Sequence, residues 1–375
     1  MKNLIHCGII TIHNVANYGA TFQALGLFQY LRNQNVDAEF IDYSMNRNIQ
    51  QNVVRRKFMS RILLLLKKLF NYRYYLNSRK KTEAFKKFWN QYFEISTNHY
   101  LGDDEFLKAS LNYDIAIVGS DQLFNLSLTN NSETYFLPNY RNYKISYSTS
   151  FGMNGLSIKN EEKVVNFLKG FNRLSIREES VAAFLKAKYG FEIQVSVDPV
   201  YLLTREEWKC FETPVKLPDK YVFCYLMSDN PNIKQVIKWI KEKEKNIQIV
   251  IVQTCKQKLS IEGHNFSDSG PAEFLTLLAN ASYVVTNSFH GCALGIIYKK
   301  KIFSLEEERF IGDQRYIAML GRAEVYDKIV PYNTDWGVFD FKKHVIDGET
   351  VYEKLKFWIQ TSKTYINESI QLCQK

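Results

Sequence analysis

Short apolar runs alternate with amphipathic stretches through the first part of the chain. The residues from Gly8 to Ile12 are apolar and lead into a polar loop. A pattern of helical period follows from Thr21 to Gln34, and a second short strand pattern runs from Ala38 to Asp42. A strand, a helix and a second strand in this order form a βαβ unit. The N-terminal region is therefore predicted to contain a parallel sheet.

The same alternation continues to about residue 200. The predicted strands are residues 113–119, 144–148, 173–177 and 195–200, and the predicted helices are residues 158–169 and 178–189. A second series follows a polar stretch at 216–220 that contains Pro218. Its predicted strands are residues 221–226, 247–253, 283–286 and 301–305, and its predicted helices are residues 232–244, 272–279 and 349–371.

Two such series in 375 residues predict two domains of ordinary size. We expect an N-terminal α/β domain at residues 1–215, a C-terminal α/β domain at 216–348, and a C-terminal helix at 349–375 that packs back across both. The predicted fold class is α/β, with two Rossmann-like parallel-sheet domains facing a cleft. Ligands of such sheets bind beyond the carboxyl ends of the strands.

The positive charge is concentrated in one segment. Residues 55–87 hold twelve basic residues and one acidic residue, which accounts for the whole net charge of +10. Apolar residues are interspersed at helical spacing, so we predict a basic helical insertion at about residues 46–100. A basic amphipathic helix suits an anionic membrane surface. The alternative is a solvated helical hairpin packed on the N-terminal domain. Nucleic acid is not expected, because no nucleic-acid motif accompanies the charge.

Other classes of protein are disfavoured by what the chain lacks. Its six cysteines form no CxxC pair, which argues against a zinc site or a disulfide framework, and no metal is expected. No apolar run approaches the roughly 20 residues that span a bilayer. The first residues, MKNLIHCGIITI, lack the features of a signal peptide. We expect a cytoplasmic protein, peripheral on the inner face of the cell membrane if residues 55–87 bind lipid.

The most informative motif is TNSFHG, residues 286–291, at the end of a predicted strand and the start of a predicted helix. Free N–H groups and the helix dipole make this a place for anions. Asn287 and Ser288 suit the helix cap, and Gly291 would allow a ligand near the backbone. His290 adds a group that exchanges protons near neutral pH. The alternative is a structural histidine bonded to a neighbouring loop.

Three further segments follow predicted strands. Arg177 ends one strand and offers a fork of donors for phosphate or carboxylate, or else pairs with Glu178 or Glu179. Asp121, in GSDQ, suits either a sugar hydroxyl or a helix cap. The loop NVANYGA, residues 14–20, could hold an acceptor or a phosphate, although Gly19 could simply permit a turn. It matches neither a dinucleotide fingerprint nor a P-loop.

Seven motifs in this order resemble those of the polysaccharide pyruvyl transferase family. They are NYGA at 17–20, GSDQ at 119–122 with Asn125, YSTSFG at 147–152, SIREES at 175–180, VDPV at 197–200, GPAEFL at 270–275 and TNSFHG at 286–291. The resemblance implies a fold like that of GT-B glycosyltransferases. It also implies transfer of pyruvate from phosphoenolpyruvate to a sugar or lipid-linked oligosaccharide, which gives a cyclic ketal.

The resemblance also implies roles for individual residues. His290 would be the general acid and Arg177 a catalytic ligand of the donor. The other residues expected to bind the donor are Asn287, Ser288, Gly291, Lys300 and Arg315, and those expected on the acceptor side are Asn17, Tyr18, Gly19, Asp121 and Gln122. No cofactor is implied, because phosphoenolpyruvate is a co-substrate.

The sequence departs from the family pattern at Phe124, where Trp is common, at Val200, where Thr is common, and at Lys301, where Pro is common. These departures leave the acceptor open. Two other functions compete with pyruvyl transfer: a GT-B-like glycosyltransferase that uses a nucleotide sugar, and a non-catalytic protein that binds a glycan.

Overall fold

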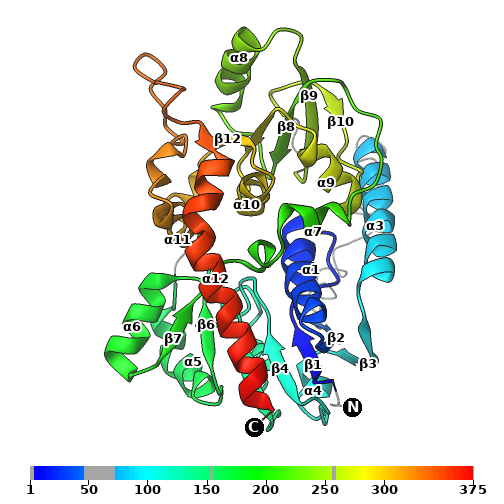
Figure 1. The fold of residues 1–375 in the computed structure, drawn as a ribbon, viewed down its shortest axis with the longest axis vertical. Coiled ribbons are helices and arrows are strands. Elements are labelled where there is room, and N and C mark those ends of the chain that lie inside the picture. The colour runs from blue at the N-terminus through cyan, green and yellow to red at the C-terminus, as the bar shows by residue number, and fades with distance from the viewer. Residues whose placement is uncertain (1–3, 46–71, 153–154, 256–258, 375) are drawn as a thin grey trace, which may run out of the picture.

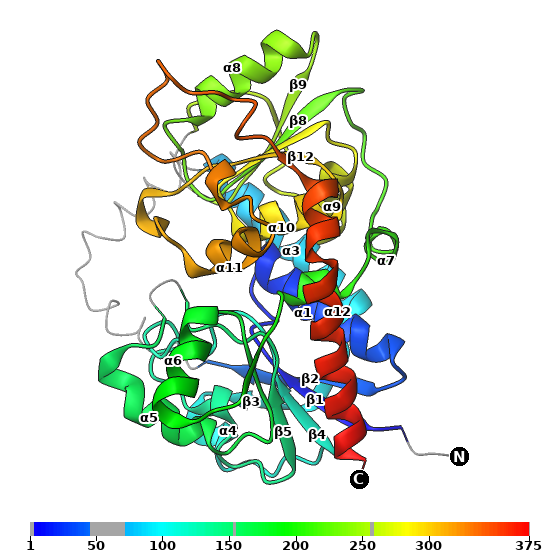
Figure 2. The ribbon, with the colours of Figure 1, turned by 60° about the vertical axis from the view of Figure 1, so that its left-hand side comes forward.

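The computed structural model describes residues 4–45, 72–152, 155–255 and 259–374. Within these residues the strands form two main sheets, one in each half of the chain, and Figures 1 and 2 show them as two lobes. Residues 46–71, which hold the first part of the predicted basic insertion with its apolar positions, lie outside the described residues.

The first sheet has the strand order β3-β2-β1-β4-β5, and all its neighbouring strands are parallel. Its strands are β1 (His6–Ile10), β2 (Asp37–Ser44), β3 (Ile95–Leu101), β4 (Ile115–Val118) and β5 (Tyr143–Ser146). Two short parallel strands, β6 (Leu174–Ile176) and β7 (Ile193–Val195), form a separate small sheet beside β5. This order is that of a doubly wound sheet that starts from a central β1.

The second sheet has the order β10-β9-β8-β11-β12-β13 and is parallel except for the edge strand β13. Its strands are β8 (Tyr221–Leu226), β9 (Gln248–Gln253), β10 (His264–Asn265), β11 (Tyr283–Thr286), β12 (Lys301–Ser304) and β13 (Ile346–Asp347). Strands β8, β11 and β12 are almost continuously buried and apolar, as expected for a parallel sheet covered on both faces.

Helices connect and cover the strands. Those of the first half are α1 (Tyr18–Asn33), α3 (Tyr72–Tyr92), α4 (Asp103–Phe106), α5 (Glu161–Leu168), α6 (Glu179–Tyr189) and α7 (Arg205–Lys209). Those of the second half are α8 (Ile233–Lys243), α9 (Pro271–Ala279), α10 (Phe289–Ile297), α11 (Gln314–Arg322) and α12 (Gly348–Cys373). Among the described residues, no helix is long and apolar enough to cross a membrane.

The strand predicted at residues 195–200 is wrong in an informative way. Strand β7 ends at Val195, and Pro199–Leu202 forms a 3₁₀ turn instead. Proline has no N–H for a sheet, and the side chain of Asp198 accepts a hydrogen bond from the N–H of Val200 at 3.0 Å. The side chain of Asp198 is thereby fixed at the start of the turn.

The region predicted as a basic insertion is partly built into the core. Residues 95–101 form strand β3, which pairs with β2, so the insertion predicted at about 46–100 runs too far. Helix α3 buries Phe85 and Trp89, and the Phe85 ring lies 4.9 Å from the ring of Tyr18. Burial of these aromatic side chains removes apolar surface from water and makes α3 part of the core. The sequence analysis did not predict this burial, because basic residues dominate the segment.

A shared aromatic core joins the two halves. The ring of Tyr18 in α1 lies 4.4 Å from that of Phe274 in α9, and Phe22 packs edge-on against Trp208 at 5.7 Å. All four side chains are buried in one hydrophobic cluster that reaches both sheets. Closely packed side chains therefore fill the space between the two halves here, and they fix the relative position of the two sheets.

Helix α12 links the halves on another side. It begins directly after β13 in the second sheet and runs along the first half, as the red helix in Figure 1 shows. The Tyr365 hydroxyl donates to the carbonyl oxygen of Ser146 at 3.0 Å, and the Ser362 hydroxyl accepts from the N–H of Val197 at 3.0 Å. The latter bond holds the segment that carries Asp198.

Candidate active site

A cavity of about 270 Å³ lies between the carboxyl ends of the two main sheets. Both halves of the chain line it. The first half contributes Asn17, Ala20, Asp121, Gln122 and Leu128, and the second contributes Tyr225, Met227, Asn287, Ser288, Phe289, His290, Leu305, Glu306, Glu307, Asp313, Arg315, Tyr316, Tyr326 and Ile329. This is the position where open parallel sheets bind their ligands.

The start of helix α10 forms one wall of the cavity. Strand β11 ends at Thr286, and the Ser288 hydroxyl caps the helix by accepting from the N–H of Gly291 at 3.4 Å. A Cβ on Gly291 would clash with the hydroxyl of Thr286, so close packing requires glycine there. Ser288, Phe289 and His290 line the cavity, and the dipole of α10 places partial positive charge among them.

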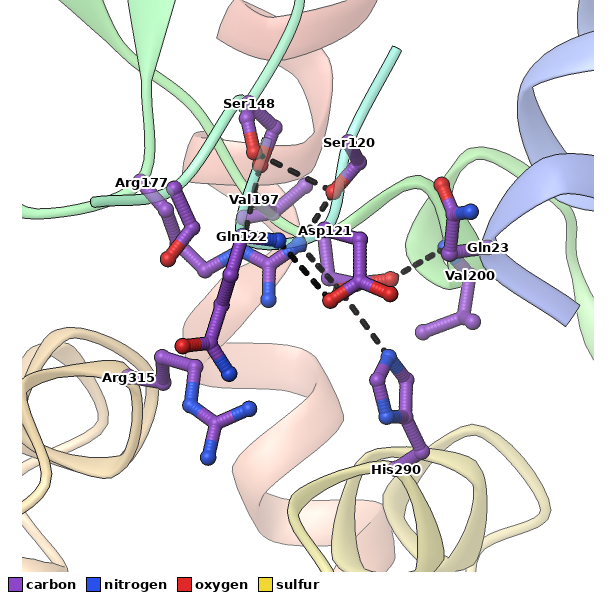
Figure 3. A network of polar contacts seen from close by, with 12 residues as sticks. Gln23, Ser120, Asp121, Gln122, Ser148, Arg177, Val197, Val200, His290 and Arg315 are labelled. Atoms are coloured by element: carbon purple, nitrogen blue, oxygen red, sulfur yellow. Dashed lines mark hydrogen bonds and ion pairs between the residues drawn. The ribbon is translucent and has the colours of Figure 1, made fainter. Parts of the chain in front are cut away.

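The imidazole of His290 lies where the two halves meet. Its side chain, labelled in Figure 3, is 12% exposed. Its Nε2 atom lies 3.4 Å from Oδ2 of Asp198. Its Nδ1 atom faces Gly19 in helix α1, where any Cβ would clash with the ring. Both neighbours belong to the first half of the chain, whereas His290 belongs to the second.

Asp198 and Arg177 form a buried ion pair behind His290. The Nη2 atom of Arg177 lies 2.7 Å from Oδ2 of Asp198, and the two side chains are 3% and 0% exposed. Arg177 also donates to the hydroxyl of Ser120 and, at 3.5 Å, to that of Ser148 (Figure 3). Burial opposes ionisation of Asp198, but the charges of Arg177 and His290 outweigh it and lower the pKa of Asp198 to about 2.

A second pair of the same kind borders the cavity. Asp313 caps helix α11 by accepting from the N–H of Arg315 at 2.9 Å, and its carboxylate also binds the Arg315 guanidinium at 2.6 Å. Burial works against the charge of Arg315, but the bonds to Asp313 prevail and raise the pKa of the guanidinium. Arg315 therefore presents a permanent cation to the cavity.

Three helices begin at this cavity. Asn17 caps α1 by accepting from the N–H of Ala20 at 3.2 Å, Ser288 caps α10 and Asp313 caps α11. Residues of all three helix starts line the cavity. Each helix start places partial positive charge at the cavity, and Arg315 adds a full positive charge. The negative charges that line the same cavity belong to Asp121, Glu306, Glu307 and Asp313.

The family of the chain can now be stated from comparison with known proteins. A sequence model of the polysaccharide pyruvyl transferases matches residues 17–308, which include all the residues that line the cavity except Asp313, Arg315, Tyr316, Tyr326 and Ile329. The chain belongs to the polysaccharide pyruvyl transferase family. The resemblance noted from the seven motifs is thereby confirmed, and so is the expectation that the chain is a transferase.

Solved structures with low sequence identity also match the chain. A protein from Listeria monocytogenes assigned to the UDP-N-acetylglucosamine 2-epimerases matches at a TM-score of 0.50 with 10% identity, over 98% of this chain and 90% of that one. The UDP-GlcNAc 2-epimerase of Methanocaldococcus jannaschii has a TM-score of 0.48 with 12% identity, over 96% and 98%. The glycosyltransferase SnogD of Streptomyces nogalater has a TM-score of 0.43 with 8% identity, over 99% and 100%. No curated protein matches by sequence.

The first of these similarities, together with the two parallel sheets, confirms the predicted GT-B-like α/β fold.

Some of the predicted site residues line the cavity and others do not. The predicted site residues that line it are Asn17, Asp121, Gln122, Asn287, Ser288, His290 and Arg315. Asp121 has a φ of 79°, a left-handed conformation that turns the chain sharply after β4.

The other predicted site residues lie away from the lining. The Tyr18 hydroxyl donates to the carbonyl oxygen of Ser269 at 2.6 Å, in the core between the halves. Gly19 and Gly291 are sites of close packing. Lys300 donates its ammonium group to the carbonyl oxygen of Ala279, and Arg177 is enclosed behind Asp198. Burial lowers the pKa of Lys300 to about 8.

Two acidic residues of this pyruvyl transferase were missed from the sequence. Asp198 was part of the VDPV motif but had no role assigned, because its partners are distant in the chain. Glu307 is buried and accepts hydrogen bonds from the side chains of Asn287 and Ser228. Asn287, which follows β11, is thereby bonded to Glu307, which follows β12.

Among the described residues, no group of His, Cys, Asp and Glu could hold a metal ion.

Proposed function

We propose that this family member transfers pyruvate from phosphoenolpyruvate to two hydroxyls of one sugar. The products are a cyclic ketal and inorganic phosphate, and the sugar belongs to a surface polysaccharide or its lipid-linked precursor. One observation carries the proposal: a histidine, a paired arginine and three helix N-termini converge on one cavity. That set supplies an acid together with binding groups for a small, highly charged donor.

Binding of the donor follows from its charge. Phosphoenolpyruvate carries a phosphate and a carboxylate, and both are held well by guanidinium groups and helix N-termini. Arg315 and the start of α10 border the same cavity, so each anionic group has a binding partner there. Asp313 keeps the guanidinium of Arg315 in place through contacts of 2.6–3.2 Å.

The chemistry needs one proton at carbon. Transfer of a proton from His290 to the methylene carbon of the donor makes a methyl group and leaves the adjacent carbon electrophilic. A sugar hydroxyl adds to that carbon and loses its proton. The carbon–oxygen bond to phosphate then breaks, and the second hydroxyl closes the ring as it loses its own proton. One of the two released protons restores His290, and the other leaves with the phosphate.

The acceptor side is formed by groups that bind hydroxyls. Asp121, Gln122 and Asn17 line the cavity from the first half of the chain, opposite the start of α10. The carboxylate of Asp121 accepts from the N–H of Gln122 at 2.9 Å and retains oxygen lone pairs for a sugar hydroxyl. This placement suits the acceptor role proposed for Asp121 and Gln122.

The acceptor also bears on location. If it is a lipid-linked sugar, the reaction would take place in the cytoplasm at the inner membrane face. The basic residues at 55–87 would then bring the enzyme to anionic lipid.

Thermal unfolding with phosphoenolpyruvate tests the donor. A ligand that binds only the folded protein stabilises it by about 2.7 kcal/mol at a hundred times its dissociation constant. We expect a rise in Tm with phosphoenolpyruvate and none with UDP-sugars. Arg315→Ala should weaken the response, whereas Lys300→Ala, outside the cavity, serves as the matched control. A response to a UDP-sugar alone would replace this donor with a nucleotide sugar, and a response to neither would leave a glycan-binding protein.

A further inference from the structure

His290 is the proposed acid, and both nitrogens of its ring face the other half of the chain. The Asp198 carboxylate lies 3.4 Å from Nε2, and Gly19 packs against the side that carries Nδ1. The Nε2 atom is buried, and Asp198 is the acidic group that reaches it. The orientation of the ring therefore depends on contacts across the junction of the two halves.

Asp198 is buried, and several contacts fix its carboxylate. Its Oδ1 atom accepts from the N–H of Val200, and its Oδ2 atom faces Arg177 at 2.7 Å. The neighbouring backbone is fixed by two more bonds, from the N–H of Val197 to Ser362 and from the indole N–H of Trp208 to the carbonyl of Val200, each at 3.0 Å. A carboxylate held in this way can determine the position of the imidazole that it contacts.

We propose that Asp198 is a positioning residue that holds a proton on Nε2 of His290, and that Arg177 contributes by fixing Asp198. Gly19 confines the other side of the ring, because a Cβ at this position would clash with Nδ1. Which nitrogen of a histidine carries the exchangeable proton is set by the bond that the other nitrogen makes. Only the use of His290 as the acid rests on the proposed function.

The charges around His290 are consistent with this assignment. Asp198 is the carboxylate in contact with the ring, after β7. The other titratable groups that line the cavity are Tyr225 in β8, Asp121 after β4, Glu306 and Glu307 after β12, Asp313 and Arg315 at α11, Tyr316 in α11 and Tyr326 beyond it. Arg177 and Arg315 lie over the ring of Phe289, 5.4 Å and 5.6 Å from its centre, so two cations flank the start of α10.

The ring tautomer of His290 tests the proposal without substrate. The side-chain nitrogens would be labelled with ¹⁵N, and the signals of His290 among six histidines would be assigned with His290→Gln. In the native protein we expect the neutral ring to carry its proton on Nε2. The double variant Arg177→Met with Asp198→Leu replaces the buried pair by apolar side chains of similar size, which proteins often tolerate. In that variant the preference for Nε2 should disappear.

An Nδ1-protonated ring in the native protein, or an unchanged Nε2 preference in the double variant, would overturn the proposal. Asp42→Asn is the matched control. It removes another carboxylate that contacts histidines, His13 at 3.8 Å and His99 at 2.9 Å, and it should leave the signals of His290 unchanged.

Binding of the donor gives a second readout. Asp198→Asn should weaken phosphoenolpyruvate binding, and Asp198→Glu, which keeps the carboxylate, should recover part of the loss. Equal weakening by the two variants would mean that Asp198 is merely structural. If the native protein binds no phosphoenolpyruvate, the proposed donor is wrong, and the tautomer measurement still decides the role of Asp198.

Discussion

Two arginine–aspartate pairs lie beside the candidate active site, and they differ in what surrounds them. Arg177 and Asp198 are 21 positions apart, almost wholly enclosed, and joined at 2.7 Å behind His290. Arg315 and Asp313 are neighbours at the start of one helix, joined at 2.6 Å, with Arg315 open to the cavity. The two pairs have the same chemistry, but only the residues of the second line the cavity.

The comparison reverses the order of importance that the motifs suggested. The sequence indicated Arg177 as a catalytic ligand of the donor and Arg315 as one of several donor-binding residues. The structure places Arg315 in the cavity lining and Arg177 outside it. A motif identifies a residue that matters to the fold or to the site. It does not distinguish these two roles, because burial of the residue depends on distant segments.

The largest expected effect separates the two pairs by stability. Arg177→Ala leaves the carboxylate of Asp198 buried without its partner, which should cost about 3–5 kcal/mol of unfolding free energy. Arg315→Ala should cost only about 1 kcal/mol, because Asp313 still caps α11 and solvent can reach the gap. Urea unfolding of both variants measures the difference. Equal losses would contradict the distinction between an enclosed pair and an accessible one.

The second prediction concerns acid. The pKa of Asp198 in the folded protein, about 2, lies below the ordinary value of about 3.9. Its ionised form therefore contributes stability that is complete above about pH 4 and is lost as the pH falls through 2. The contribution should be about 2 kcal/mol. Urea unfolding at pH 5, 4 and 3 should give a steeper loss in the native protein than in Asp198→Asn. Parallel curves would show that Asp198 is not strongly stabilised as an anion.

The smallest effect sharpens the role of Arg315. Arg315→Lys keeps the charge but loses the fork of donors, so phosphoenolpyruvate should bind about tenfold more weakly, equivalent to ~1.4 kcal/mol. Calorimetric titration gives the affinity. The same change at Arg177 should act mainly on stability. If Arg177→Lys weakened binding more than Arg315→Lys in folded protein, Arg177 would be the donor ligand after all.

The predicted elements that held are those whose pattern is local. The alternation of apolar runs and amphipathic stretches predicted parallel sheets, and the strand predicted at 283–286 matches β11. The start of α10 was recognisable because a capping serine follows the strand directly. The strand at 195–200 failed because one proline and one capping carboxylate outweighed its apolar pattern.

The sequence by itself determined the family, the alternating α/β architecture and the position of His290 at a helix start, because each rests on neighbouring residues. Only the tertiary structure decided which charged groups meet. Asp198 reaches His290 across 92 positions of sequence, and Lys300 is held away from the cavity by the backbone of Ala279. Such contacts arise when two separately patterned halves pack together. No spacing along the chain encodes them, because burial and electrostatic partners depend on the whole fold.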